Sequence, residues 1–308
     1  MKNISIMFSG QGAQAPGMGK DLYEASKAAK DIFDKANDIL GYDLANLCFT
    51  GTAEDLTACA TCQPAIFTMS QACLAALNEA LEGKLNPVAV AGLSLGEYSG
   101  LVAANVLSFQ DALKLVALRG KLMDQACHNT QGAMSAVLGA EIDVVQEACK
   151  QADVDIANLN CPGQIVISGA ADKIARANEI LGAKGLRVVA LQVAGAYHSR
   201  LMQEAANQFT TELSKYDFKQ PTRKFAQNFT GEFVESAQDI PGNLAKQICG
   251  SVRWESCLRN LMANSELLIE CGPGSVLCGF VKRTDKNAKA LPVNSFQAFQ
   301  DAAKAILE

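Results

Sequence analysis

The chain has 308 residues, of which 49% are hydrophobic and 19% are charged, so it can bury a large core in one or two domains. Its formal net charge is −5, and lysine and arginine form no dense cluster, which argues against a nucleic-acid-binding protein. The 11 cysteines are scattered and there are only 2 histidines, so we expect reduced thiols in a cytoplasmic protein and no metal site.

The first apolar run, residues 4–8, is typical of a β-strand. It is too short for the core of a signal peptide or for a membrane span, and we therefore expect neither export nor a membrane. The glycine-rich turn Gly10-Gln11-Gly12 follows at once. Its backbone can approach a ligand closely, and one of its amides could stabilise an oxyanion, although such turns are commonly simple tight connections.

Strand-like and helix-like runs continue to alternate up to residue 91. We expect helices over residues 21–40 and 68–81 and a strand over 88–91. This alternation predicts an α/β domain with a parallel sheet.

The pentapeptide Gly92-Leu93-Ser94-Leu95-Gly96 joins the strand at 88–91 to a helix-compatible segment. A G-x-S-x-G turn between a strand and a helix is so tight that glycines must flank it, and it displays the serine hydroxyl at the carboxyl end of the strand. The amide of Leu95 then faces any oxyanion formed by attack of Ser94. Ser94 is thus a candidate nucleophile, and a glycine-flanked turn that merely contains serine is the alternative.

Residues 109–127 predict an amphipathic helix that begins after Ser108, with Asp111 completing a pattern similar to a capping box. Arg119 lies within the apolar stripe of this helix. A buried, unpaired guanidinium costs about 3–5 kcal/mol, so an anion must meet it. A protein carboxylate such as Glu97 or the carboxylate of a ligand could supply that anion.

The pattern changes between residues 132 and 193, where the elements become shorter and follow the order βαββαβ. We expect strands over 133–138, 156–159, 165–168 and 187–193 and helices over 143–152 and 173–183. This order is typical of a ferredoxin-like unit.

Longer elements return after this unit, with helices expected over 201–216 and 252–264 and a strand over 267–270. We therefore predict a discontinuous, α/β-hydrolase-like large domain that carries the nucleophile elbow and consists of residues 1–128 and 198–308. The ferredoxin-like subdomain, residues 129–197, is inserted into it.

A serine nucleophile needs a base, and histidine serves most often near neutral pH. His128 follows the helix over 109–127, where histidine is a favourable neighbour of the carbonyl-rich end. His198 instead lies in the loop 195–199 between the small unit and the next helix, a position typical of catalytic side chains. We expect His198 to be the base, and a polar residue at a helix start is the alternative.

Together these motifs resemble those of the malonyl-CoA:acyl carrier protein transacylases of fatty acid synthesis and of the related acyltransferase domains of polyketide synthases. The resemblance covers essentially the whole chain. It is carried by residues 8–14, 63–65, 92–98, 119–120, 132–134, 157–160, 164–169, 195–199, 252–254 and 272–274.

The resemblance implies a ping-pong reaction, in which Ser94 takes the malonyl group from coenzyme A as an ester and passes it to the phosphopantetheine thiol of acyl carrier protein. It also implies that His198 is the base and is oriented by a backbone carbonyl near Arg253. The amides of Gln11 and Leu95 would bind the oxyanion.

In such a protein, Arg119 would bind the free carboxylate of malonate, and Gln63, Asn158 and Asn160 would line the substrate cleft. Acetyl-CoA would leave the guanidinium without a partner, which explains selectivity for malonyl-CoA. Leu93 departs from the family, which usually has histidine there, and we expect altered packing or coenzyme A contact without loss of the base. No cofactor is implied, and we expect a monomer.

Three other interpretations stay open. The protein could serve polyketide instead of fatty acid assembly. A serine thioesterase would use the same elbow and histidine, but it would normally bring a carboxylate to that histidine and would leave Arg119 unexplained. A silent module that only docks carrier protein is disfavoured by intact Ser94, His198 and Arg119.

Overall fold

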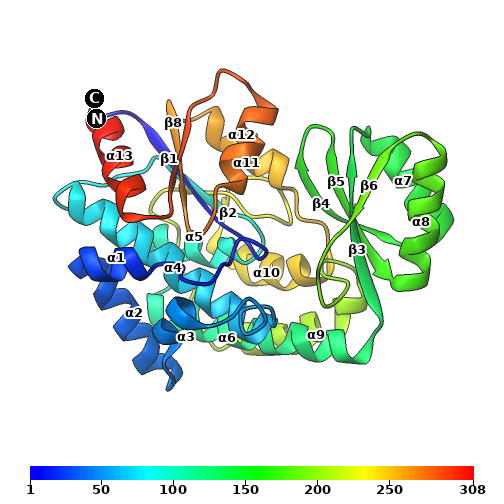
Figure 1. Cartoon of the computed structure of the whole chain (residues 1–308), viewed down its shortest axis with the longest axis horizontal. Helices are drawn as coiled ribbons and strands as arrows, with labels where there is room; N and C mark the ends of the chain where they lie inside the picture. Colours follow the sequence, from blue (N-terminus) through cyan, green and yellow to red (C-terminus); the bar gives the residue numbers. More distant parts are fainter.

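The computed structural model describes residues 1–308 and contains two β-sheets (Figure 1). The strands of the first sheet are β1 (Ile4–Phe8), β2 (Ala89–Gly92), β7 (Lys224–Phe225), β8 (Leu267–Cys271) and β9 (Ala290–Val293). They are all parallel and lie in the order β7-β2-β1-β8-β9. The carboxyl ends of β1, β2 and β8 therefore meet at one edge of the sheet, where α/β proteins commonly bind ligands. This confirms the predicted parallel α/β sheet.

The central strands are short apolar runs because both of their faces are covered. Ile6 of β1 and Ile269 of β8 face the larger apolar core, whereas Met7 of β1 and Leu268 of β8 face a smaller one. The sheet is thus packed between two layers of helices, and the loops at its carboxyl edge follow well-packed strands.

The helices of this larger part cover both faces of the parallel sheet. On the larger core lie α1 (Lys20–Ala25), α2 (Lys27–Leu40), α3 (Leu44–Thr50), α4 (Cys59–Ala80), α5 (Gly96–Ala103), α6 (Phe109–Asn129), α9 (Gln203–Leu213), α10 (Ile240–Cys249) and α13 (Phe296–Leu307). On the smaller core lie α11 (Trp254–Met262) and α12 (Val276–Thr284). No helix combines the length and the apolar character that crossing a membrane requires.

The second sheet stands beside the first, with its two helices on the face turned away from it (Figure 1). Its elements are β3 (Gly132–Leu138), α7 (Ile142–Ala152), β4 (Asp155–Cys161), β5 (Gln164–Ala170), α8 (Ala171–Ala183) and β6 (Arg187–Ala190). The strands are antiparallel in the order β4-β5-β3-β6, and they share a separate apolar core with the helices.

Several expected elements differ in extent from the observed ones. The helix expected over 21–40 is interrupted at Ser26, whose hydroxyl accepts a hydrogen bond from the amide of Ala29 and so caps α2. The helix expected over 201–216 begins with a 3-10 turn at Arg200–Met202 and ends at Leu213. Helices α3, α10, α12 and α13 and strands β7 and β9 were not predicted, because their short or mixed apolar patterns identify neither element.

Candidate active site

The G-x-S-x-G turn between β2 and α5 is a sharp elbow, as its sequence predicts. Ser94 has a φ of 51°, in the left-handed region that residues other than glycine rarely adopt. A Cβ atom on Gly92 would lie 2.0 Å from the carbonyl oxygen of Gly96, and one on Gly96 would lie 2.3 Å from the carbonyl oxygen of Phe8. Both glycines are thus required by backbone contact, and the strain is concentrated at the serine.

Asn228 holds this elbow in place and was not identified from the sequence. Its Oδ1 accepts a hydrogen bond of 2.5 Å from the amide of Ser94, and its Nδ2 donates one of 2.8 Å to the carbonyl of Gly92. The side chain is fully buried. Its position shortly after β7, at the carboxyl edge of the sheet, is the signal that could have identified it.

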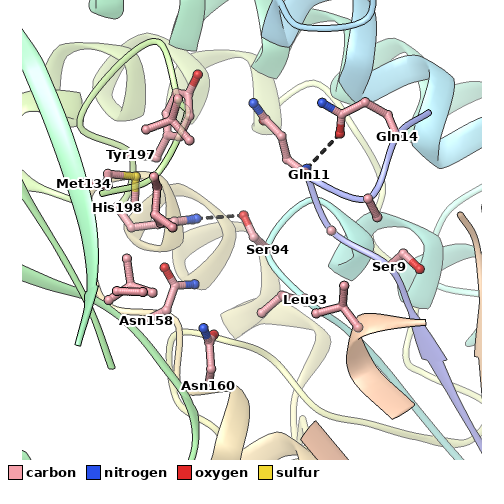
Figure 2. A pocket seen from close by; sticks show the side chains of 18 of the residues that line it. Ser9, Gln11, Gln14, Leu93, Ser94, Met134, Asn158, Asn160, Tyr197 and His198 are labelled. Carbon is pink, nitrogen blue, oxygen red and sulfur yellow. Dashed lines mark hydrogen bonds between the residues drawn. The ribbon is translucent and has the colours of Figure 1, made fainter. Parts of the chain in front are cut away.

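Ser94 and His198 are in direct contact (Figure 2). The distance from Ser94 Oγ to His198 Nε2 is 2.7 Å. Burial and the nearby charge of Arg119 lower the pKa of His198 to about 4, so the imidazole is neutral at pH 7 and can accept the proton of the serine hydroxyl. His198 also has a positive φ, 56°, in its loop. The structure therefore brings together the nucleophile and the base that the sequence suggests.

The carbonyl that orients His198 belongs to Gln247, which corrects the expectation that it lies near Arg253. The distance from His198 Nδ1 to the Gln247 carbonyl oxygen is 2.7 Å. Gln247 lies in the last turn of α10, where carbonyl groups have no partner within the helix. The carbonyl of Arg253 is already engaged, because it accepts from the amide of Cys257 at the start of α11.

Arg119 lies directly behind the nucleophile and has only neutral hydrogen-bond partners. Its Nη1 donates to Gln63 Oε1 at 2.7 Å, and its Nη2 donates to Ser94 Oγ at 3.1 Å and to Gln247 Oε1 at 3.0 Å. The side chain is 1% exposed, and its Nε has no partner. Donors of a buried guanidinium are normally all engaged, so Arg119 keeps hydrogen-bonding capacity that the protein does not use.

Glu97 does not pair with Arg119, although the sequence left that alternative open. Its carboxylate accepts hydrogen bonds from the backbone N–H of Asn228 at 3.0 Å, from Gln227 Nε2 at 3.0 Å and from Gln247 Nε2 at 2.8 Å. Burial raises the pKa of Glu97 to about 7, and these three donors oppose that rise. The amide of Gln247 thus lies between the buried acid and the buried cation.

A cavity of about 350 Å³ opens in front of Ser94, between the edge of the parallel sheet and the antiparallel sheet. Asn158 and Asn160 of β4 line it opposite the elbow (Figure 2), and Oδ1 of Asn160 has no partner in the protein. Neither Gln63 nor Arg119 belongs to its wall; Gln63 bonds Arg119, which in turn bonds Ser94 Oγ at the cavity. The lining residues that surround the reacting groups are Gln11, Leu93, Ser94, Met134, Tyr197 and His198.

The backbone amides of Gln11 and Leu95 have no hydrogen-bond acceptor within the protein. They come from the loop after β1 and from the elbow after β2, two paired strands whose carboxyl ends lie side by side. Two free amides beside a nucleophile can bind the oxyanion of a tetrahedral intermediate. The arrangement can therefore support acyl transfer through a serine ester.

The second histidine, His128, is exposed and does not contact Ser94. His128 bonds the carbonyl of Asp124 at the end of α6, which agrees with a helix-terminal role. Leu93 lines the cavity and packs beside Gly10, and it makes no hydrogen bond with the His198 ring, whose partners are Ser94 and Gln247.

Comparison with known proteins agrees with this geometry. The family model described as acyl transferase domain matches residues 6–296. A malonyl CoA-acyl carrier protein transacylase from Bacillus subtilis (strain 168) is 38% identical over 100% of this chain and 98% of its own length. A protein of the same name from Staphylococcus aureus (strain MRSA252) is 38% identical over 98% of this chain and 97% of its own length.

Solved structures give the same result. An acyl carrier protein S-malonyltransferase from Vibrio cholerae superposes with a TM-score of 0.92 at 37% identity, covering 97% of this chain and 99% of its own. A malonyl-transacylase in complex with a type II polyketide synthase acyl carrier protein gives a TM-score of 0.94 at 35% identity, covering 98% and 99%. The chain belongs to the acyl transferase family, among the relatives of malonyl CoA-acyl carrier protein transacylases.

Proposed function

We propose that this protein transfers the malonyl group from malonyl-CoA to the phosphopantetheine thiol of an acyl carrier protein and so supplies malonyl-acyl carrier protein for fatty acid synthesis. One observation carries the proposal. The hydroxyl of Ser94 contacts a neutral histidine and an arginine without an ion pair at the same time. The names of the relatives agree with this activity.

In the first half of the reaction, His198 Nε2 takes the proton from Ser94 Oγ while that oxygen attacks the thioester carbonyl of malonyl-CoA. The amides of Gln11 and Leu95 bind the oxyanion, and such a donor typically contributes about 100- to 1000-fold in rate. The intermediate collapses to the malonyl ester of Ser94, and the imidazolium returns its proton to the departing thiolate of coenzyme A. In the second half, the carrier protein thiol attacks the ester through the same steps.

Arg119 selects the acyl group. Its Nη2 bonds the free Ser94 hydroxyl, and acylation turns that hydroxyl into a poorly accepting ester oxygen. The released donor and the unpartnered Nε can then bond the free carboxylate of malonate. An acetyl group offers no carboxylate, so the guanidinium would stay buried without an anion.

The hydrogen-bond partner of His198 Nδ1 favours acyl transfer over hydrolysis. A serine thioesterase normally pairs its histidine with a carboxylate, whereas the partner of His198 is the backbone carbonyl of Gln247. Polyketide assembly remains the alternative pathway, since one structural relative was solved with a carrier protein of that class. The identity of the accepting carrier protein distinguishes the two pathways.

We also propose a domain division, a cellular location and an oligomeric state for this protein. Residues 129–197 form a ferredoxin-like subdomain within an α/β-hydrolase-like domain of residues 1–128 and 198–308, an interpretation supported by the strand order β4-β5-β3-β6. The protein acts as a cytoplasmic monomer without a cofactor, and its reaction involves neither nucleic acid nor membrane. Asn158 and Asn160 contact the substrate from the wall of the subdomain.

Intact-mass spectrometry tests this function directly. After mixing with malonyl-CoA, the protein should carry one malonyl adduct, and peptide mapping should place it on Ser94. Adding carrier protein with its phosphopantetheine arm should move the adduct to that thiol. An adduct that leaves only as free malonate would contradict transfer and support the hydrolase.

A further inference from the structure

Gln247 is the one side chain that bonds both buried charged groups beside the nucleophile. Its Nε2 donates to Glu97 Oε2 at 2.8 Å, and its Oε1 accepts from Arg119 Nη2 at 3.0 Å. The residue is fully buried, as is Glu97. The mechanism above uses only its backbone carbonyl, so the role of the side chain is unassigned.

The orientation of this amide is fixed by its neighbours. Nε2 also donates to the carbonyl of Ser94 at 3.0 Å. Rotating the amide by half a turn would place its oxygen against the Glu97 carboxylate and its N–H groups against the Arg119 guanidinium, which is unfavourable at both ends. The amide dipole therefore has its positive end toward the anion and its negative end toward the cation.

The consequence concerns the availability of Arg119. Opposite charges in a buried site attract strongly, and a direct pair with Glu97 would occupy the donors that a substrate carboxylate needs. The backbone N–H of Asn228 and Nε2 of Gln227 also donate to Glu97, but only the Gln247 amide bonds the guanidinium as well and so separates the two charges. Glu97 can thus compensate the charge of Arg119 without a direct contact. The N–H donors of Arg119 then bond only neutral acceptors, which a substrate carboxylate can replace.

We propose that the side chain of Gln247 is a specificity-determining positioning residue, which separates Glu97 from Arg119 and thereby keeps the guanidinium available for the carboxylate of malonate. The inference rests on the proposed function. It concerns selectivity between acyl groups, because the histidine contact of Gln247 is made by the backbone and is retained when the side chain changes.

The variant Gln247→Glu tests this role with a side chain of nearly the same shape. Its carboxylate would contact Arg119 directly and neutralise it in place of the substrate. At pH 8 we expect the ratio of malonyl to acetyl ester formed on Ser94 from equal concentrations of the two coenzyme A thioesters to fall at least about tenfold. Acylation by acetyl-CoA should change much less.

Gln227→Glu is the matched control. Gln227 also donates to Glu97 and is buried, but it makes no contact with Arg119. The same change of charge next to the same acid should therefore leave the malonyl to acetyl ratio close to that of the wild type, even where it lowers the melting temperature. The double variant Arg119→Ala/Gln247→Glu should show no further loss of the ratio beyond Arg119→Ala alone.

Three results would overturn the inference: an unchanged ratio in Gln247→Glu, an equal loss of both acyl groups, or an equal fall of the ratio in Gln227→Glu. If Gln247→Glu does not fold, as shown by its thermal unfolding, Gln247→Met takes its place, and an unchanged ratio in that variant also overturns the inference. Failure of the proposed function is separate, because it is judged on the wild type alone, which would then form no malonyl ester or release it only as free malonate.

Discussion

Two arginines show how differently this molecule uses the same side chain. Arg200, in the turn that follows the histidine loop, is exposed and forms ion pairs of 2.7 Å with both Asp153 and Asp155 of the small unit. Arg119 is 1% exposed and forms no ion pair with any acid of the protein. The arginine with the greater need for an anion is therefore the one that has none.

Solvent explains the difference. Water screens the charges around Arg200, so that its carboxylate partners contribute little stability and serve mainly to fix the turn. A buried guanidinium loses its hydration, and neutral oxygens replace that hydration only in part. Under the proposed function, a substrate carboxylate removes this cost at Arg119, which converts a local instability into selectivity.

We expect the largest effect on the acylation rate from substitutions of the two reacting residues beside Arg119, Ser94 and His198. Ser94→Ala should form no acyl ester with any thioester, because no other hydroxyl bonds His198. His198→Ala should slow acylation by about 100- to 10,000-fold, the usual contribution of a general base. Quenched-flow mass spectrometry measures both rates. An ester on Ser94→Ala would place the nucleophile elsewhere.

The pH dependence of acylation tests how burial and the charge of Arg119 affect His198. The pKa of His198 is lowered to about 4 from 6.5, so labelling of Ser94 by acetyl-CoA should persist as the pH is reduced to about 5 and fall only near the lowered pKa. The contribution of this group to stability is present above pH 6.5 and is lost as the pH falls toward 4, because the unfolded chain then binds the proton more readily.

A rate profile and thermal unfolding at matched pH values measure these two effects separately. An inflection in the acylation rate close to pH 7 would contradict the assignment to His198. It would indicate control by Glu97 instead, because burial raises the pKa of that residue to about 7.

We expect the smallest effect from substitution of the exposed arginine, Arg200. Arg200→Ala should shift the midpoint of thermal unfolding by about 2 °C or less, because exposed ion pairs are screened by water. The ratio of malonyl to acetyl ester should not change. A large fall in that ratio would mean that the exposed ion pairs position the histidine loop, and the two arginines would then not have separate roles.

Much of the site could be predicted because its residues stand in patterns that local geometry dictates. The glycines around Ser94 mark a turn that no other residue fits, and Arg119 interrupts an apolar helical stripe. The loop position of His198 was a weaker signal, and the structure confirms its contact with Ser94. The parallel sheet followed from the alternation of apolar runs, which depends on local sequence in the same way.

The polar network behind the site could not be predicted. Gln247 and Asn228 lie more than a hundred residues after Ser94, and no local pattern shows that amides at these positions return to the elbow. The expectation for Arg253 was wrong for a related reason, since the choice of carbonyl depends on where α10 ends and on which carbonyls are already engaged. Such contacts are properties of the tertiary structure.

The account depends most directly on Arg119 as an unpaired cation that binds malonate. The decisive measurement is the competition between equal concentrations of malonyl-CoA and acetyl-CoA for Ser94, read by intact mass in the wild type and in Arg119→Ala. We predict that the wild type forms mainly malonyl ester and that the variant loses this preference by about 100-fold or more while it keeps or gains acetyl ester. An unchanged malonyl preference in Arg119→Ala would contradict the account.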